Sequence, residues 1–518
     1  MITGKRIFKT SRWIHKYPGL VLLLFLAWMS LSGVLLNHPG LVRGISVAGF
    51  LVPGHYNPEN WNRSGMKGLL QFDSLTYFAY GNEGIYVSEN SGKSFTGFMD
   101  GNFPNAAWKR RTNHLVCLVG TNQLLAATNT GLFISDLKLR QWQQIILPGN
   151  LEPVQKILFK ADTCIVVTKS AFYTTENNNL NGFTRIVPGK AAEEEHILMF
   201  RAFLELHDGS IWGLPGKLLW DIAGLILFFL CFSAFYVWYY PKKWRRNYKR
   251  KNIHTSKTEK KRRSFFLRYH KKLGWYAAIL LIIIFFTGIF LRLPLLITIA
   301  QSSLAKKYYP AWKHKNPWHE KINNALFNSQ NNRLMLECTD GLWAGDISGQ
   351  LVFEKMHLPV PIFAMGATVF EEESPDNWLI GSFAGLFRFS LSNSRGISLL
   401  SLKTESNRGR PSSVLVTGYV AGFNNTNYVL DHYKGLCDVD GTPQPTVLPM
   451  PAEIKQNFRM SLWNFLFELH NARIFQGAIG GFYILIIPLF GMISLLILMS
   501  GVFDYWYVKL KKSNRTNN

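Results

Sequence analysis

Histidines recur at matched positions in two distant parts of this chain. The residues His15, Gly19, Gly33 and Pro39 recur 255 positions later as His270, Gly274, Gly288 and Pro294. A second repeat follows, because Glu205-Leu206-His207 recurs 263 positions later as Glu468-Leu469-His470. Paired imidazoles on a helical bundle are suited to holding haem iron from both sides. The four histidines are therefore candidate axial ligands.

The duplication also predicts which histidines pair. Two copies related by a pseudo-two-fold axis would place His15 opposite His270 near one membrane face and His207 opposite His470 near the other. Each iron would then be six-coordinate, which suits electron transfer. No C-x-x-C-H attachment site is present, so the haem type expected is b, with one or two per chain. Interfacial polar histidines without a ligand role are the alternative.

Glycines accompany the first pair of histidines at fixed spacings. Gly19 and Gly274 follow the histidines by four residues, and Gly33 and Gly288 follow by 18 residues, which is five whole turns of a straight helix. All four would then lie on nearly the same face as the imidazole. Glycine there leaves room for a flat macrocycle or for a neighbouring helix.

Two further polar residues lie in or beside the apolar runs. Asp221 is an acid within the second apolar run and is a candidate for a proton route, although a hydrated pair with Lys217 one turn earlier is the alternative. His38 is a substitute ligand candidate at the end of the first run. The second copy has Leu293 at this position, which argues against ligation by His38.

Four apolar runs are long enough to cross a bilayer as helices, near residues 18–37, 214–240, 274–297 and 479–506. They divide the chain into a first span with its N-terminus (1–38), a first β insert (39–213), a second span (214–241), a basic loop (242–273), a third span (274–297), a second β insert (298–478) and a fourth span with the C-terminus (479–518).

The net charge of +25 is concentrated beside these runs. Residues 1–17, 242–272 and 508–518 contribute +5, +14 and +4. The positive-inside rule places all three segments and both termini in the cytoplasm, and both inserts outside. We therefore expect a multi-pass protein of a bacterial inner membrane with two periplasmic inserts, and no binding of nucleic acid.

The inserts have the alternation and turn residues of β-strands. A short pattern recurs at spacings of about 40 to 50 residues, the length of a propeller blade. Its copies are Gly84-Ile85-Tyr86, Gly131-Leu132-Phe133, Ala171-Phe172-Tyr173, Gly341-Leu342-Trp343, Gly385-Leu386-Phe387 and Gly435-Leu436-Cys437. Three copies per insert cannot close a ring, so we expect one joint propeller-like all-β domain of six to eight blades. Two separate β-sandwiches are the alternative.

With these residues in view, the chain resembles the PepSY-associated transmembrane-helix family, which includes iron-regulated membrane proteins and ferric-siderophore reductases. One signature is His-x-x-x-Gly opening a span that ends in Ser/Thr-Gly, here Ser32-Gly33 and Thr287-Gly288. The other is Leu206-His207-Asp208-Gly209 followed by Gly213-Leu214-Pro215-Gly216; the copy at Leu469-His470-Asn471-Ala472 lacks the glycine. The resemblance implies electron transfer through b-type haems to ferric chelates in the periplasm.

The sequence thus predicts a membrane α-helical bundle of four spans in two parallel repeats, with a periplasmic β-domain. The expected function is a haem-dependent oxidoreductase that passes electrons across the inner membrane from an unidentified donor, with ferric siderophore as a candidate substrate. A membrane-anchored propeller receptor or assembly factor without redox activity is the main alternative, and a transporter component is another. No Walker loop or dinucleotide fingerprint is present.

Overall fold

The chain folds into two compact units. The computed structural model describes residues 4–118, 120–150, 152–176, 179–180, 182–190, 196–300, 302–309, 316–346, 352–363, 365–400 and 411–516. The helical unit consists of Met1–Val42, Glu194–Lys313 and Leu462–Asn518, and the β unit consists of Arg43–Glu193 and His314–Ser461. Both inserts therefore contribute to a single β unit, and they do not form two separate domains.

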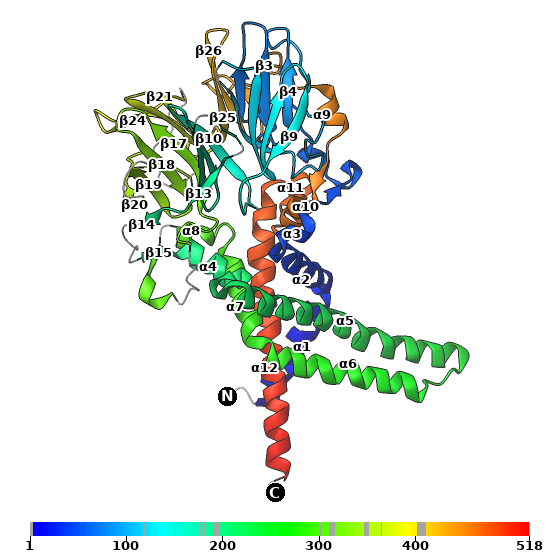
Figure 1. Cartoon of the computed structure of the whole chain (residues 1–518). Helices are drawn as coiled ribbons and strands as arrows, with labels where there is room; N and C mark the ends of the chain where they lie inside the picture. Colours follow the sequence, from blue (N-terminus) through cyan, green and yellow to red (C-terminus); the bar gives the residue numbers. More distant parts are fainter. Residues whose placement is uncertain are drawn as a thin grey trace. The chain divides into compact units, whose positions relative to one another are not determined.

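Two long helices and two bent helix pairs form most of the helical unit (Figure 1). The long helices are α5 (Gly213–Lys251) and α12 (Ile486–Thr516). The bent pairs are α1 (Gly4–Val21) with α2 (Leu23–Asn37), and α6 (Lys257–Tyr276) with α7 (Ala278–Phe290). The bends measure 68° and 64°. They fall at Leu22 and Ala277, so the internal duplication extends to the position of the bend.

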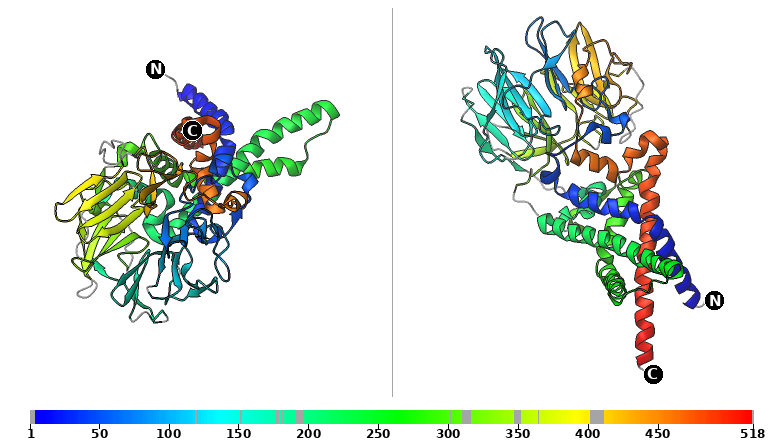
Figure 2. Two further views of the ribbon diagram at one scale, coloured as in Figure 1. Left: turned by 90° about the horizontal axis from the view of Figure 1, so that it is seen from above. Right: turned by 90° about the vertical axis from the view of Figure 1, so that its right-hand side faces the viewer.

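The bends allow each pair to pack on both long helices. Helix α1 contacts α12 while α2 contacts α5, and in the second copy α6 contacts α5 while α7 contacts α12. The two long helices run at a steep angle to each other in the views of Figures 1 and 2. The helices therefore interlock across the two halves of the chain and do not simply lie side by side.

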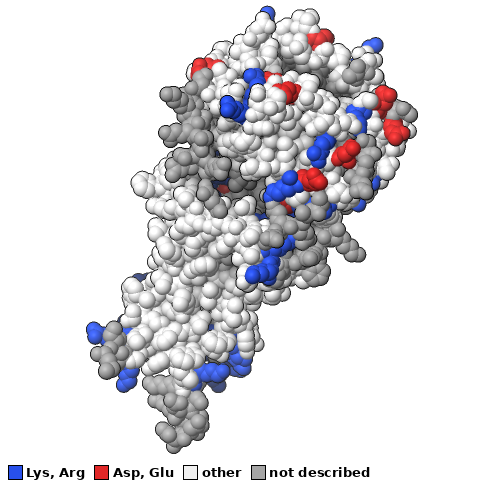
Figure 3. Space-filling model, turned by 90° about the vertical axis from the view of Figure 1, so that its left-hand side faces the viewer, with Lys and Arg blue, Asp and Glu red and all other residues white. Residues whose placement is uncertain are grey.

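Segments long and apolar enough to cross a membrane are present in this unit. Two single helical segments qualify, Ser210–Lys251 and Arg473–Leu510, and each bent pair also qualifies if it counts as one span, which makes up to four among the described residues. On α5, large apolar side chains such as Leu218, Ile222 and Leu225 point outward. On the face that Figure 3 shows, the helical unit carries few charged side chains along most of its length, as contact with lipid requires.

The basic segment 242–273 is mostly helical, where the sequence analysis expects a loop. Helix α5 continues to Lys251 and α6 begins at Lys257, so only residues 252–256 connect them. Lys and Arg are strong helix formers. A capping box starts α6, because the Ser256 hydroxyl accepts from the Glu259 backbone N–H and the Glu259 carboxylate accepts from the Ser256 N–H.

Short elements complete the helical unit. They are α3 (Pro39–Val42), α4 (Met199–Asp208), η3 (Ser210–Trp212), α8 (Leu296–Ala300), η4 (Lys306–Tyr308), α10 (Leu462–His470), η5 (Arg473–Phe475), α11 (Gln476–Ile479), η6 (Gly480–Leu485) and a ribbon of β15 (His196–Leu198) with β16 (Ser303–Ala305).

Six sheets make up most of the β unit. Strands that follow one another in sequence form each sheet by antiparallel pairing, and one sheet has a further, parallel strand. The first three sheets are β2 (Gly68–Gln71), β3 (Tyr77–Gly81), β4 (Gly84–Ser88) and β5 (Thr96–Gly97); β6 (Thr112–Cys117), β7 (Gln123–Thr128), β8 (Gly131–Asp136) and β9 (Gln141–Ile145); and β10 (Val154–Lys160), β11 (Thr163–Thr168), β12 (Phe172–Thr175) and β13 (Thr184–Ile186).

The second insert contributes the other three sheets. They are β17 (Ile322–Asn328), β18 (Arg333–Cys338), β19 (Gly341–Asp346) and β20 (Val352–Met356); β21 (Val369–Ser374), β22 (Asn377–Ser382), β23 (Gly385–Ser390) and β24 (Arg395–Ser398); and β25 (Val416–Phe423), β26 (Thr426–Asp431) and β27 (Gly435–Cys437). Strand β14 (Gly189–Lys190) of the first insert pairs in parallel with β20 and so joins the inserts.

Smaller elements connect the sheets of the β unit. They are β1 (Ser46–Val47), which pairs with β28 (Met460–Ser461), the 3-10 turns η1 (Gly49–Leu51) and η2 (Gly54–Tyr56), and α9 (Ala452–Gln456).

The six sheets contact one another in a cyclic order. Their first strands are neighbours in the sequence β2, β6, β10, β17, β21, β25 and back to β2. An apolar cluster fills each gap between successive sheets, and the cluster between the last and the first contains Tyr86, Leu430 and Leu436. Burial of these side chains is the main contribution that holds the sheets together.

The repeated sequence pattern marks equivalent positions of the six sheets. Each copy begins the third strand of its sheet or immediately precedes it. Five of the six copies begin with glycine, and the backbone φ of this glycine is positive, as at Gly131 (133°) and Gly385 (126°). A residue with a side chain is strained in this conformation, which explains why glycine follows the tight turn after the second strand.

Candidate functional site

The structure brings the four predicted histidines together in two pairs, both within the helical unit. The ring centres of His15 and His270 are 6.0 Å apart, and their planes meet at 75°. The ring centres of His207 and His470 are 6.2 Å apart, with 62° between the planes. These are the partners that the internal duplication predicts. We call them the α1–α6 pair and the α4–α10 pair, after the helices that carry them.

Each imidazole is hydrogen-bonded through Nδ1. The Nδ1–H of His15 donates to the carbonyl of Ile497 over 3.0 Å, and that of His207 donates to the carbonyl of Ile284 over 3.0 Å. The direction is fixed, because a carbonyl oxygen can only accept. A neutral imidazole with a proton on Nδ1 has a free lone pair on Nε2, and this is the form that binds a metal.

The other two histidines reach the same protonation state through serine. Nδ1 of His270 is 2.8 Å from the Ser233 hydroxyl, and Nδ1 of His470 is 2.8 Å from the Ser32 hydroxyl. Each serine donates its own proton to a carbonyl one turn earlier, at Leu230 for Ser233 and at Trp28 for Ser32. When the serine proton is on this carbonyl, the serine oxygen accepts from Nδ1–H, which again leaves Nε2 with its lone pair.

Each of the four contacts made by a histidine Nδ1 joins the two copies of the repeat. The α1 histidine is held by α12 and the α6 histidine by α5. The α4 histidine is held by α7 and the α10 histidine by α2. Thr287 of α7 also lies 3.2 Å from Nδ1 of His207, at the position equivalent to Ser32. Neither half of the chain can orient its own histidines.

The glycines have different neighbours from those that a straight helix predicts. Because α1 and α2 are bent, Gly33 does not share a face with His15. A Cβ at Gly33 would lie 3.5 Å from Cε1 of His470, and a Cβ at Gly288 would lie 2.8 Å from Cε1 of His207. Gly288 therefore makes room for the imidazole of the opposite copy, whereas a Cβ at Gly33 would be at ordinary contact distance from His470.

Gly19 and Gly274 serve helix packing in this structure. A Cβ at Gly19 would meet Ile497 at 3.6 Å, and one at Gly274 would meet Leu230 at 3.7 Å, both at ordinary contact distance. The close neighbour of His15 is instead Gly501 of α12, where a Cβ would lie 2.7 Å from the ring. The sequence pattern alone did not point to Gly501.

The sequence pattern also missed the hydrogen-bond partners of the imidazoles. Ser32 and Thr287 appeared only as part of a family signature, with no role assigned. Ser233 was overlooked, although Ser500 follows it at an offset of 267, close to the other repeat offsets, and donates to the Ile497 carbonyl that holds His15. Serine or threonine next to a small residue in a span was the signal that could have identified these positions.

Asp221 is buried and pairs with His38, and not with Lys217. The Oδ2 atom of Asp221 is 2.7 Å from Nε2 of His38, and its Oδ1 atom accepts from the Asn37 amide over 3.1 Å. The same amide donates to the backbone carbonyl of Asp208, the residue after His207. Asp221 is 7% exposed, and the His38 side chain is 30% exposed. A hydrogen-bonded chain thus leads from a half-exposed imidazole toward the α4–α10 pair.

Two buried donors beside His470 have no acceptor within the described part of the chain. They are Nε of Arg292 and Nδ2 of Asn471. Arg292 is close enough to His470 to interact with it electrostatically. The Arg292 side chain also hydrogen-bonds to Tyr483. Buried polar groups in proteins are nearly always hydrogen-bonded, so Nε of Arg292 and Nδ2 of Asn471 are available to a ligand with acceptor oxygens.

Groups of three or more His, Cys, Asp or Glu side chains that could hold a metal ion by themselves are not found among the described residues. All five cysteines are free. A histidine pair supplies only two ligands, so any metal bound there would need its remaining ligands from another group.

Solved structures resemble the chain only weakly. The extracellular domain of BT4673 from B. thetaiotaomicron, described as a one-component system, aligns with 11% identity and a TM-score of 0.33, over 74% of this chain and 34% of that chain. An ancestral GH74 enzyme aligns with 12% identity and a TM-score of 0.29, over 72% and 35%. The N-terminal domain of Nup159 aligns with 9% identity and a TM-score of 0.28, over 74% and 90%. The chain thus spans about a third of the first two structures.

Comparison at the level of sequence gives a clearer result. No curated protein shows significant similarity to the chain. Residues 192–509 match the model of the family described as the PepSY-associated TM region, and this match covers more than half of the chain. The matched region contains three of the four paired histidines, all of α5 and most of α12. The protein therefore belongs to the family of PepSY-associated transmembrane regions.

Proposed function

We propose that this protein transfers electrons across a bacterial inner membrane through two b-type haems, one held by each histidine pair. The observation that carries the proposal is the arrangement of the four imidazoles: each is held through Nδ1 by a helix of the opposite copy, and the rings lie in two pairs with centres 6.0 and 6.2 Å apart. Nε2 of each ring is the atom left for a metal. When bound, such a haem supplies a one-electron Fe(III)/Fe(II) couple.

The spacing of the rings fits this role. A metal–imidazole bond of ~2.0 Å places each ring centre roughly 3 Å from the metal, so two rings on opposite sides of one iron have centres about 6 Å apart. The measured distances are 6.0 and 6.2 Å. The glycines that face the imidazoles remove side-chain bulk at the same places. His15, His270, His207 and His470 would be the axial ligands.

The unpartnered donors near His470 also fit a haem. Its two propionate groups are carboxylates, and Arg292 and Asn471 offer buried N–H groups that lack an acceptor among the described residues. A charge-assisted hydrogen bond from a guanidinium to a carboxylate is among the strongest in proteins. In this proposal Arg292 and Asn471 hold the carboxylates at the α4–α10 pair.

The bends shorten the path between the two pairs. His15 and Ser32, which holds His470, are 17 residues apart in the chain. A straight helix would separate them by ~26 Å, whereas a helix bent by 68° at Leu22 reduces the distance to roughly 21 Å. Transfer between two haems across the membrane is therefore easier than in a bundle of straight helices.

Asp221 and His38 supply a proton route in this proposal. Reduction of a haem adds negative charge to a buried site, and uptake of a proton nearby offsets it. His38 can receive the proton at the more exposed end, and Asp221 accepts the hydrogen bond from it. Asn37 fixes the carboxylate and links it to the backbone next to His207.

The six sheets complete the proposal as a periplasmic, propeller-like domain. The cyclic contacts of the first strands and the shared apolar clusters support this arrangement. With both termini cytoplasmic, the α1–α6 pair would accept electrons and the α4–α10 pair would deliver them to a periplasmic acceptor, for which ferric siderophore is our candidate. Reduction weakens the chelate, because hard oxygen ligands bind Fe(III) more tightly than Fe(II).

The test is the visible spectrum of the full chain, purified in detergent from cells supplied with haem. We expect two haems per chain and reducible Soret and α bands. Alanine at His15 or His270 should remove one haem, and alanine at His207 or His470 should remove the other; His254→Ala, in the exposed connection, is the matched control. Because the ring planes are far from parallel, the ferric protein should give highly anisotropic low-spin EPR signals.

Protein without haem from such cells, or four single variants with unchanged spectra, would refute the proposal. A membrane-anchored receptor would then be the remaining function. The observation that favours this second candidate is a pocket of about 610 Å³ in the β unit.

A further inference from the structure

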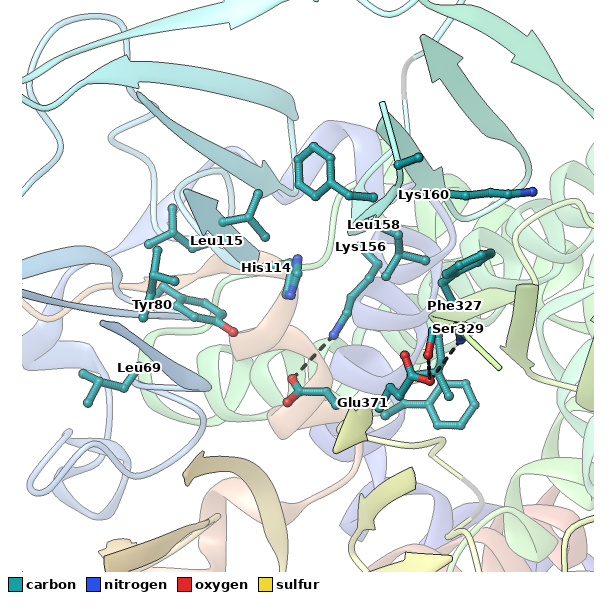
Figure 4. Close-up of a pocket in the computed structure, with 17 residues that line it drawn as sticks. Leu69, Tyr80, His114, Leu115, Lys156, Leu158, Lys160, Phe327, Ser329 and Glu371 are labelled. Carbon is teal, nitrogen blue, oxygen red and sulfur yellow. Dashed lines mark hydrogen bonds and ion pairs between the residues drawn. The ribbon is translucent and has the colours of Figure 1, made fainter. Parts of the chain in front are cut away.

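The pocket lies where the first strands of the sheets converge (Figure 4). Strands β2, β6, β10, β17 and β21 contribute to its wall, so residues from both inserts line it. Its volume of about 610 Å³ is within the usual range for a site that binds a small organic ligand. Part of the wall is apolar, with side chains such as Leu115, Leu158, Phe327 and Phe370.

A poorly compensated ammonium group lies inside this pocket. The side chain of Lys156 is only 8% exposed, and the nearest carboxylate oxygen, on Glu371, is 3.5 Å from Nζ. The Glu371 side chain is 48% exposed, so water weakens its field at the amine. A buried ammonium group is costly unless a well-placed anion pairs with it.

Two hydrogen-bond donors lie next to this amine. Nδ1 of His114 accepts from the backbone N–H of Ile157, so Nε2 carries the proton of the neutral ring. Burial, and secondly the charge of Lys156, lowers the pKa of His114 well below its usual value, so the ring is neutral at pH 7. Burial raises the pKa of Tyr80, whose hydroxyl stays protonated. Figure 4 shows Lys156, His114 and Tyr80 directed into the same space.

A second lysine adds positive charge beside these residues. Lys67 donates from its backbone N–H to the carbonyl of Tyr80, and its amine donates to the neutral amide oxygen of Asn113 over 3.0 Å. Burial, and secondly Arg111, lowers the pKa of Lys67 to about 8, so it is still charged at pH 7. The second carboxylate of the wall, on Glu372, already accepts from the backbone and the hydroxyl of Ser329.

We infer that this pocket binds a negatively charged chelate of a trivalent metal ion, whose oxygen ligands accept hydrogen bonds from Lys156, His114 and Tyr80. The metal in this assignment rests on the proposed redox function, whereas the negative charge and the oxygen acceptors follow from the wall of the pocket. The apolar side chains contact the organic part of the chelate. Without a bound anion, the Glu371 carboxylate forms the ion pair with the Lys156 amine.

The experiment uses gallium(III) complexes of citrate and of dihydroxybenzoate, because gallium(III) resembles iron(III) in size and charge but is not reduced. Binding to the full chain in detergent is measured by equilibrium dialysis with quantification of gallium. Lys156→Gln should weaken binding by about tenfold or more, the usual effect of losing a charged hydrogen bond. Lys156→Arg should largely restore it, and Lys138→Gln, on the exposed surface of the β unit, should have no effect.

Glu371→Gln gives the sharpest arm of the test. Loss of the competing carboxylate should strengthen binding of an anion severalfold, whereas a cationic ligand would bind more weakly to this variant. The thermal unfolding midpoint of each variant confirms that the β unit is folded. Absence of gallium binding to the wild type, equal binding by wild type and Lys156→Gln, or weaker binding by Glu371→Gln would overturn the inference.

The two proposals can fail separately. The same dialysis with a variant that lacks all four paired histidines should give unchanged gallium binding. If the protein binds the gallium complexes but contains no haem, the assignment of the pocket stands and the electron-transfer function is refuted. If the protein contains haem but does not bind gallium, the electron-transfer function stands and the assignment of the pocket is refuted.

Discussion

The Ser32 hydroxyl is 2.8 Å from Nδ1 of His470, although 438 positions separate the two residues in the chain. The equivalent threonine, Thr287, is 3.2 Å from Nδ1 of His207. The Ser or Thr of each repeat therefore contacts the histidine of the other repeat, and Gly288 also makes room for its ring. The two repeats stay in register because each supplies half of both sites.

Replacement of Ser32 should loosen the haem of the α4–α10 pair. Ser32→Ala removes the acceptor that fixes the His470 ring, and loss of such an outer hydrogen-bond partner typically costs about 10- to 100-fold in metal affinity. Haem retention by the detergent-purified protein, measured during competition with apomyoglobin, is the readout. Ser30→Ala is the matched control, since Ser30 donates to the carbonyl of Ala27 on the same helix. Equal retention by both variants would contradict the role assigned to Ser32.

Alanine at the glycines should have graded effects. Gly288→Ala and Gly501→Ala each place a Cβ less than 3 Å from an imidazole ring and should abolish the haem signal of one pair. Gly19→Ala introduces only a 3.6 Å contact with Ile497 and should leave both signals intact. Gly33→Ala, at 3.5 Å from His470, should have a small effect. The haem content per chain of each variant is the measurement. A larger loss of haem in Gly19→Ala or Gly33→Ala than in Gly288→Ala or Gly501→Ala would show that the imidazoles take up other positions when haem is bound.

Loss of the Asp221 carboxylate should uncouple reduction from protonation. If Asp221 and His38 take up the proton, the midpoint potential of one haem falls with rising pH in the wild type, and Asp221→Asn or His38→Gln flattens this dependence. Redox titration of the wild type and the variants at a series of pH values provides the measurement. Lys217→Gln is the control, because Lys217 is near Asp221 in sequence but is not its partner. An unchanged slope in the Asp221 variant would exclude it from the route.

The stability of the β unit should fall as the pH rises from about 4.5 to about 8. Burial, as the main cause, raises the pKa of Glu337 from 4.5 to about 8. In this window the folded protein keeps a proton that the unfolded chain releases, so the free energy of unfolding falls by up to ~1.4 kcal/mol per pH unit. Below 4.5 and above 8 the contribution is constant.

Thermal unfolding of the full chain, followed by tryptophan fluorescence, measures this effect. Glu337→Gln should remove the pH dependence and raise the unfolding midpoint at about pH 8, where the buried wild-type carboxyl is losing its proton. Glu354→Gln, an exposed position on β20, is the control and should behave as the wild type does. A wild-type midpoint that does not change across this pH window would contradict the prediction.

The sequence predicted the histidine partners because duplication is visible without a structure. His15 with His270 and His207 with His470 follow from two constant offsets and one assumed axis. The recurring short pattern likewise located the six sheets, because in five of them a tight turn with positive φ requires glycine at the same place.

The environment of the histidines could not be predicted in the same way. A straight helix places Gly33 below His15, but the bend at Leu22 turns α2 toward α5 and brings Gly33 to His470. Local sequence did not reveal the bend: α1 contains Pro18, but the second copy has Leu273 at the equivalent position and bends as well. For the same reason the sequence offers Lys217, on the same helix, as a possible partner of Asp221, whereas its partners in the structure lie at and just beyond the end of α2.

The exchange of hydrogen bonds between the repeats has a consequence for the ancestry of the protein. A polypeptide with one copy would supply one histidine of each pair and would lack the helices that orient it. If the histidine pairs hold haem as we propose, it would bind haem only as a homodimer with two identical subunits. A single chain that holds both copies fixes their ratio at one to one and allows the two copies to differ. They differ at His38, the partner of Asp221, because the second copy has Leu293 at the equivalent position. Two separately expressed halves should accordingly assemble into a heterodimer.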